Sequence, residues 1–163
     1  MPNRAQGADV TDDKLLIHGT CVALPEDDAG WAAVLLRGPS GAGKSDLALR
    51  LIDEGACLVA DDQTKLRRHR GSLLAGPPAT IAGRIEVRGL GILTLPYRDD
   101  VPLRLVCDLI APEAVERLPE AGCVHLADMN IPVLALAPFD ASTPAKLRLG
   151  VRAITHGIVS RTN

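Results

Sequence analysis

Apolar residues gather in short runs along this chain, and polar or glycine-rich turns separate the runs, a pattern typical of strands. Helical spacing or helix-start signals predict helices at 46–52, 112–118 and 142–154. The remaining runs predict a hairpin over 63–75 that turns at Arg70-Gly71, and strands at 14–24 (interrupted at His18-Gly19), 32–36, 57–60, 103–110, 124–127 and 131–136. The chain therefore combines many short strands with few helices.

Composition indicates one folded domain. The chain has 163 residues, of which 47% are hydrophobic and 23% charged, enough for a core of its own. It contains one Trp, one Tyr and one Phe, so Leu, Ala, Val and Ile must fill that core. We expect the domain to span 14–154, between flexible tails at 1–13 and 155–163. The net charge of −2 argues against a surface built for nucleic-acid phosphates.

The cysteines and the apolar runs bear on the compartment. Cys21, Cys57, Cys107 and Cys123 include no C-x-x-C pair, and three of the four lie in or beside apolar runs, as buried free thiols do. No apolar run approaches the ~20 residues that a membrane helix requires, and the first residues lack a secretory apolar region. We expect a reduced, cytoplasmic protein without a membrane partner.

A glycine-rich loop is the most informative motif. Between the predicted strand 32–36 and the predicted helix 46–52, the chain matches G-x-x-x-x-G-K-[ST] in full. In that setting backbone N–H groups and a helix N-terminus converge on phosphate oxygens. The lysine would reach the terminal phosphates, and the serine hydroxyl would hold Mg²⁺. The predicted nucleotide-binding residues are Gly38, Pro39, Ser40, Gly41, Ala42, Gly43, Lys44 and Ser45.

Two acidic residues follow the next predicted strand. Asp61 and Asp62 come directly after the run 57–60, which places them at the carboxyl edge of the strands, beside the phosphate loop. Adjacent residues leaving a strand point in opposite directions, so we expect one of them to face the γ-phosphate and the other to support the metal or the backbone. A carboxylate near the γ-phosphate would act as base toward a hydroxyl acceptor.

Two other motifs are less specific by themselves. By itself, a lone histidine in a strand, such as His18, is more often structural than functional. Glu86 and Arg88 alternate with Ile85 and Val87, so their side chains share one face of a strand. They could form a buried ion pair, or the carboxylate could bind Mg²⁺.

Taken in order, these motifs resemble the catalytic domain of bacterial HPr kinase/phosphorylase. His-Gly at 18–19, the loop at 38–45, Val-Ala-Asp-Asp at 59–62 and Glu-Val-Arg-Gly-Leu-Gly-Ile at 86–92 occur in the order of that family. The resemblance runs from about residue 15 to residue 138, and the stretch 86–92 is highly specific to the family. It implies an α/β fold of the HPr kinase and PEP carboxykinase type, with a P-loop core, a mostly β mixed sheet and few helices.

The resemblance also implies an activity. The family uses Mg²⁺ and ATP to phosphorylate a serine of HPr, a small phosphocarrier protein, and reverses the reaction with inorganic phosphate. Carried onto this sequence, Lys44 would bind the phosphates, and Ser45 and Glu86 would bind Mg²⁺. Asp62 would accept a proton in the kinase direction and donate it in the reverse direction.

Two further residues take roles from the resemblance. His18 would support the site near the phosphates. Arg117, in Val-Glu-Arg-Leu at 115–118, matches a family arginine and would stabilise the charge of the transferred phosphoryl group. The family assembles as hexamers, which implies a homo-oligomer here.

The sequence also departs from the family. The family's separate N-terminal domain has no counterpart, and its extended C-terminal helix is shortened here. The segment tied to dephosphorylation reads Pro-Val-Leu-Ala-Leu-Ala-Pro at 132–138. Two alternatives stay open: a P-loop kinase of a small metabolite, and a non-catalytic module that senses ATP.

Overall fold

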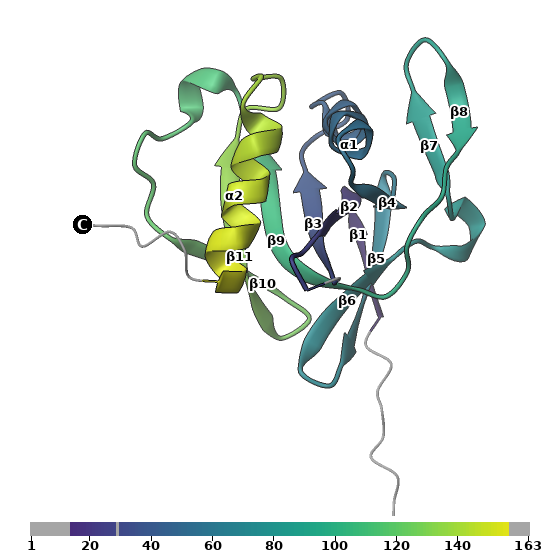
Figure 1. Cartoon of the computed structure of the whole chain (residues 1–163), viewed down its shortest axis with the longest axis horizontal. Coiled ribbons are helices and arrows are strands. Elements are labelled where there is room, and N and C mark those ends of the chain that lie inside the picture. The colour runs from purple at the N-terminus through teal and green to yellow at the C-terminus, as the bar shows by residue number, and fades with distance from the viewer. Residues whose placement is uncertain (1–13, 29, 157–163) are drawn as a thin grey trace, which may run out of the picture.

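The computed structural model consists mostly of β-strands, with two α-helices, and describes residues 14–28 and 30–156 (Figure 1). The predicted tail 1–13 and most of the tail 155–163 lie outside the described residues. The helices are α1 (Lys44–Asp53) and α2 (Thr143–His156), with short 3₁₀ turns η1 (Ala79–Ile81) and η2 (Pro112–Ala114). The strands are β1 (Lys14–His18), β2 (Thr20–Pro25), β3 (Trp31–Arg37), β4 (Cys57–Ala60), β5 (Gln63–His69), β6 (Ser72–Gly76), β7 (Arg84–Val87), β8 (Gly91–Thr94), β9 (Val101–Leu109), β10 (Gly122–Leu126) and β11 (Met129–Leu136).

The main sheet is mixed, as the family resemblance implies. Its strands follow the order β1-β5-β6-β9-β3-β2-β4, with β11 added to β9 and β10 to β11. β3 pairs in parallel with β9, and β9 in parallel with β11, whereas β2 is antiparallel to both β3 and β4. β3, β4, β9 and β11 therefore all run in one direction, and their carboxyl ends meet at one edge of the sheet.

Both faces of the central strand β3 are buried. Ala33 and Leu35 join a core cluster that includes residues of the β5–β6 hairpin. Val34 and Leu36 face the other way, into a cluster with residues of α1 and α2. This explains why the stretch reads as a continuous apolar run: a strand covered on both faces has no polar side. The two helices thus cover one face of the sheet (Figure 1).

Most predicted elements form where the sequence places them. The hairpin turns at Arg70 and Gly71, both with positive φ (47° and 75°), the backbone that a two-residue hairpin turn of type I′ requires. The final helix runs to His156, two residues beyond the expected boundary at 154. Among the described residues, no helix is both long and apolar enough to cross a membrane.

The predicted helix at 112–118 is wrong. Only the three-residue turn η2 forms, and Val115 is already extended (φ −71°, ψ 119°). Leu118 precedes Pro119, a position that disfavours helical backbone. Its side chain is 86% exposed, so no apolar face anchors a helix there. A short segment without such packing does not sustain a helix.

Candidate functional site

The glycine-rich loop joins β3 to α1 at the edge where the parallel strands end (Figure 1). Gly41 and Gly43 adopt φ of 82° and 98°, a left-handed backbone that residues with a side chain rarely take. The bond from Ala42 N–H to the Pro39 carbonyl (3.0 Å) closes the loop, and Leu47 N–H donates to the Gly43 carbonyl (2.9 Å) as the helix begins. The structure thus forms the strand, loop and helix that the motif predicts.

Lys44 already lies over this loop. Its ammonium donates to the carbonyls of Gly38 (2.7 Å) and Pro39 (2.9 Å), and the residue is 7% exposed. The charge is therefore held inside the turn of backbone that a phosphate would enter. A phosphate oxygen there would compete with the two carbonyls for the ammonium protons.

Asp61 is the centre of the polar network beside the loop. Its carboxylate accepts hydrogen bonds from Ser45 Oγ (2.7 Å), from Thr20 Oγ1 (3.1 Å) and from the backbone N–H of Glu86 (3.0 Å). The residue is 8% exposed, and these donors compensate the cost of burying it. This bonding joins α1, β2, β4 and β7 at one point.

Asp62 takes the opposite position, as expected of adjacent residues. Its backbone lies in the left-handed region (φ 67°), which Asp tolerates better than most residues. Its side chain is 71% exposed, and its Oδ1 lies 3.5 Å from His18 Nε2. Two backbone bonds hold this bend: Asp62 N–H donates to Thr20 Oγ1 (3.2 Å), and Gly19 N–H donates to the Asp62 carbonyl (2.8 Å).

Glu86 enters this group through its main chain. β7 alternates between exposed and buried residues, and Glu86 is exposed whereas Ile85 and Val87 are buried. Arg88 is also exposed, so the buried Glu–Arg pair that the sequence allowed is not present in the described structure. The bond from Glu86 N–H to Asp61 places β7 beside the P-loop. Binding of Mg²⁺ by the carboxylate of Glu86 stays a prediction.

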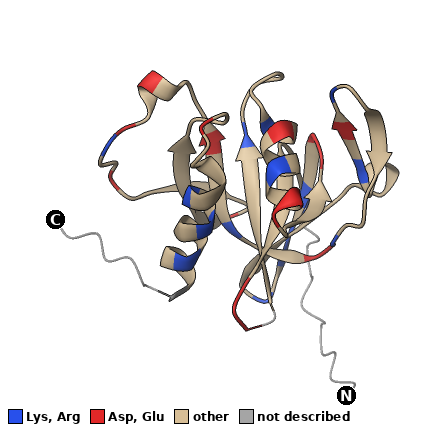
Figure 2. Ribbon diagram, turned by 45° about the horizontal axis from the view of Figure 1, so that its top comes forward, with Lys and Arg blue, Asp and Glu red and all other residues tan. Residues whose placement is uncertain are grey.

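Arg117 is the predicted site residue that the structure does not bring to the loop. It lies in the exposed segment after η2, and no hydrogen bond or ion pair among the described residues joins it to the P-loop or to Asp62. In Figures 1 and 2 this segment lies at the opposite end of the molecule from the β7–β8 hairpin. Its role therefore remains a prediction.

Sequence reasoning missed three contributors to the site. Thr20 bridges Asp61 and Asp62, and its position next to His18-Gly19, as a polar residue opening an apolar strand, was a usable signal. Arg37 precedes the P-loop and forms a two-bond ion pair with Asp108 of β9 (2.8 and 3.0 Å), which ties the two parallel strands together at this edge. No local pattern could reveal that pair, because the partners are 71 residues apart.

The described residues offer Mg²⁺ a pair of oxygen ligands but not a complete binding site. Among the described residues, no three His, Cys, Asp or Glu side chains converge to hold a metal by themselves. Mg²⁺ is usually held by one or two protein oxygens together with water and substrate phosphates. Ser45 Oγ and the Asp61 carboxylate, in contact at the mouth of the loop, supply such a pair.

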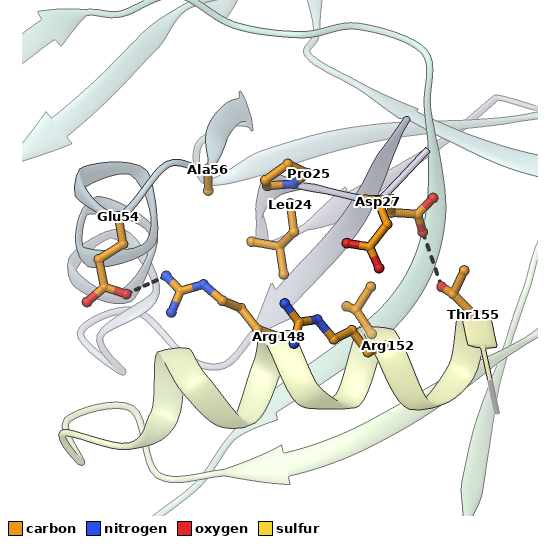
Figure 3. Close-up of a pocket in the computed structure, with 10 residues that line it drawn as sticks. Leu24, Pro25, Asp27, Glu54, Ala56, Arg148, Arg152 and Thr155 are labelled. Carbon is orange, nitrogen blue, oxygen red and sulfur yellow. Dashed lines mark hydrogen bonds and ion pairs between the residues drawn. The ribbon is translucent and has the colours of Figure 1, made fainter. Parts of the chain in front are cut away.

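A separate hollow lies at the other end of α1, between that helix, α2 and the turn after β2 (Figure 3). Arg148 and Arg152 project into it from α2, and Arg148 forms an ion pair with Glu54 at the end of α1. Thr155 donates a hydrogen bond to Glu26 (3.1 Å). None of the predicted site residues lines this hollow. The ion pair and the hydrogen bond at its rim connect α2 to α1 and to the turn after β2.

Charged residues are mixed around the candidate site and uniform on α2. In Figure 2, acidic and basic segments alternate along α1 and the β7–β8 hairpin, whereas α2 carries only basic ones. The surroundings of the site therefore carry both cationic and anionic groups.

Comparison with known proteins gives a consistent result. The family model of the HPr Serine kinase C-terminal domain matches residues 12–98, which include the P-loop, the two aspartates and Glu86 but not Arg117. HPr kinase/phosphorylase of Clostridium tetani (strain Massachusetts / E88) is 40% identical over 89 residues, covering 52% of this chain and 28% of that protein. HPr kinase/phosphorylase of Azoarcus sp. (strain BH72) is 41% identical over 105 residues, covering 60% of this chain and 32% of that protein. The chain thus spans about a third of the length of these relatives.

A solved structure shares the fold. The Hpr(Ser) kinase/phosphatase from Coxiella burnetii superposes with a TM-score of 0.72 at 24% identity, covering 85% of this chain and 88% of that chain. The α/β fold with a mostly β mixed sheet, which the resemblance implied, is confirmed.

Proposed function

This chain belongs to the HPr serine kinase C-terminal domain family, and on that premise we propose that it transfers the γ-phosphoryl group of ATP to a serine of an HPr-type phosphocarrier protein. One observation carries the proposal: the P-loop serine and the acidic pair share one sheet edge, with Ser45 Oγ 2.7 Å from Asp61. Phosphoryl transfer needs a phosphate cradle, a metal site and a group that activates the acceptor, and these residues offer all three.

In this proposal the P-loop holds the nucleotide. The N–H groups of the loop and of the first turn of α1 would bind phosphate oxygens, and Lys44 would exchange its carbonyl partners for the terminal phosphates. Ser45, Asp61 and, by family resemblance, Glu86 would hold Mg²⁺. The metal ion, when bound, neutralises charge that develops on the phosphate oxygens.

Asp62 is the proposed base. Its exposed carboxylate would take the proton of the acceptor serine as the serine oxygen bonds to the γ-phosphorus and the bond to the leaving ADP oxygen breaks. His18, 3.5 Å away, would orient that carboxylate. In the reverse direction protonated Asp62 would return the proton to the serine oxygen, while inorganic phosphate accepts the phosphoryl group. Arg117 would stabilise the transferred group only if its exposed segment approached the P-loop.

The test is a transfer assay with HPr. The chain, Mg²⁺ and γ-labelled ATP are incubated with HPr, with HPr whose acceptor serine is replaced by alanine, and with a pool of small metabolites. Label on the serine of HPr supports the proposal. Label on a metabolite would identify a small-molecule kinase, and ATP binding without transfer to any acceptor would identify a sensing module; either result would overturn it.

Two other parts of the proposal do not depend on the site. A cytoplasmic location is expected from the sequence, and assembly into a homo-oligomer, a hexamer, is expected by family resemblance. Analytical ultracentrifugation of the full chain would test the second, and a purely monomeric species at micromolar concentration would contradict it.

A further inference from the structure

We infer that Phe139, in the loop between β11 and α2, is the platform on which the base of the nucleotide stacks. This inference rests on the proposed function, because it takes the P-loop to be a nucleotide site. It adds a binding surface for the base and a preference for purine nucleoside triphosphates.

The sheet topology brings Phe139 to the P-loop. β3, β4 and β11 run in the same direction, so the P-loop after β3, the aspartates after β4 and the loop after β11 all leave the sheet at one edge. In the sheet order, β4 lies on one side of β3 and β11 on the other. Figure 1 shows the loop before α2 on one side of α1, and β4 with the β7–β8 hairpin on the other side.

That arrangement determines where a base would go. A triphosphate in the cradle with its terminal phosphate toward Ser45 and Asp61 extends its other end away from β4. The opposite side of the cradle is the side of β11 and Phe139. The base would therefore lie near the ring of Phe139 and away from Asp61 and Asp62.

Phe139 touches the P-loop directly. A Cβ atom built on Gly43 would lie 2.8 Å from Phe139 Cζ and 3.1 Å from Pro138 Cβ, which shows that the ring packs directly against the loop. The ring nevertheless remains exposed, with 66% of the residue accessible. A large apolar side chain with one edge against the phosphate loop and its surface in water is suited to a flat, apolar ligand group.

The loop that carries the ring is held in place. The Arg50 guanidinium of α1 donates to the Pro138 carbonyl and to the Asp140 carbonyl (3.5 Å), while its Nε donates to Asp46 (3.0 Å). The buried Thr143 hydroxyl donates to the Ala137 carbonyl. These bonds hold both ends of the segment 137–143, so the ring is positioned before a ligand arrives, which lowers the cost of binding.

No other aromatic residue of the chain can take this role. Trp31 begins β3 at the far edge of the sheet, and its ring is covered by Arg98 at 4.0 Å. Tyr97 pairs with Leu58 and contacts Gly83, on the side of β4 and β7. Phe139 is the single phenylalanine in a sequence nearly free of aromatics, and it lies beside the phosphate loop.

The experiment measures binding of the full chain to three magnesium complexes: ATP, CTP and inorganic tripolyphosphate. Stacking on an aromatic ring contributes ~1–3 kcal/mol per base, so Phe139→Ala should weaken ATP binding roughly five- to 140-fold. Tripolyphosphate, which has no base, should bind both proteins equally. ATP should bind the native chain more tightly than CTP, because a purine has the larger face.

Two variants serve as controls. Phe139→Leu keeps an apolar contact with Gly43 and loses the aromatic face, so it should behave like Phe139→Ala, whereas Phe139→Tyr should restore ATP affinity. Leu118→Ala removes another exposed apolar residue, from the segment after η2, and should change nothing. In the transfer assay, Phe139→Ala should raise the KM for ATP and leave kcat nearly unchanged.

The outcomes separate the two proposals. Equal loss of ATP and tripolyphosphate binding in Phe139→Ala, or no loss of either, would overturn the base platform even if HPr is phosphorylated. The expected loss for ATP alone, in a chain that transfers no phosphoryl group, would support the platform and contradict the kinase. Full ATP affinity in Phe139→Leu would show that only apolar contact matters and would also overturn the stacking role.

Discussion

Asp61 and Asp62 are adjacent in sequence and differ completely in surroundings. Asp61 is buried and accepts three hydrogen bonds, while Asp62 projects into solvent beside His18. The left-handed backbone at Asp62 produces this difference, because it turns the chain sharply between β4 and β5. Asp61 is therefore held in place by its neighbours, while the side chain of Asp62, the proposed base, remains accessible to an acceptor.

Asp62→Asn tests the proposed base. The amide keeps the size of the side chain but cannot accept the serine proton, so transfer to HPr should slow by roughly a hundredfold or more. ATP affinity and the free energy of unfolding should hardly change, since the side chain is largely exposed. Single-turnover assays measure the rate of transfer, and nucleotide titration measures the affinity for ATP. Transfer at the native rate would assign the proton to another acceptor.

Lys44→Ala tests the cradle. The variant loses the ammonium that lies on the loop carbonyls, so phosphoryl transfer should fall to background and ATP binding should weaken. Lys146→Ala, which removes an exposed lysine of α2, is the matched control and should retain activity. Label transfer and ATP titration on both variants provide the comparison. Near-native turnover in Lys44→Ala would exclude the P-loop from catalysis.

At the scale of elements, one buried hydroxyl helps to hold the link between β11 and α2. Thr143 is fully buried at the start of α2, and its Oγ1 donates to the carbonyl of Ala137, itself 2% exposed. Together with the bonds from Arg50 to the Pro138 and Asp140 carbonyls, this bond holds the segment that carries Phe139.

Thr143→Val should destabilise the protein. Valine matches threonine in shape but leaves the Ala137 carbonyl without its donor, which costs about 1–3 kcal/mol. Thr143→Ser keeps the hydroxyl and should cost less. Urea unfolding followed by circular dichroism gives the free energy of unfolding for both. If serine proved as destabilising as valine, the loss would come from packing of the methyl group and not from the hydrogen bond.

At the scale of the whole molecule, the four cysteines differ in how deeply the core buries them. All four are free thiols; Cys21 and Cys107 are buried in the sheet, Cys57 is half-buried and Cys123 is exposed. Burial raises the pKa of Cys21, and burial together with the charge of Asp108 raises the pKa of Cys107 to about 12. The expectation of buried free thiols is thus confirmed for two of them.

Thiol labelling should follow this order. At pH 8 a disulfide reagent should modify Cys123 rapidly and Cys57 more slowly, and should reach Cys21 and Cys107 only on unfolding. Because an unfolded thiol ionises near its ordinary pKa of about 8.5, the free energy of unfolding should fall as the pH rises above that value. Fast labelling of all four thiols in native buffer would contradict the described core.

The resemblance to a family was readable because it rests on local patterns. The P-loop motif, the aspartate pair and the stretch 86–92 each occupy a few consecutive residues, and the family match covers all of them. The expected helix at 112–118 failed because its local start signals had no apolar face to anchor them. Arg117, placed by analogy on that segment, consequently has no described contact with the cradle.

The sequence by itself determined most of the strands, the phosphate loop and the opposite orientations of Asp61 and Asp62, because periodicity, glycine positions and strand alternation are local properties of the chain. Only the tertiary structure decided which distant groups meet. The order of the sheet, with β11 on one side of β3 and β4 on the other, places Phe139 over Gly43 and Thr20 against Asp61. Such contacts arise from strand pairings between residues far apart along the chain, which no short segment encodes.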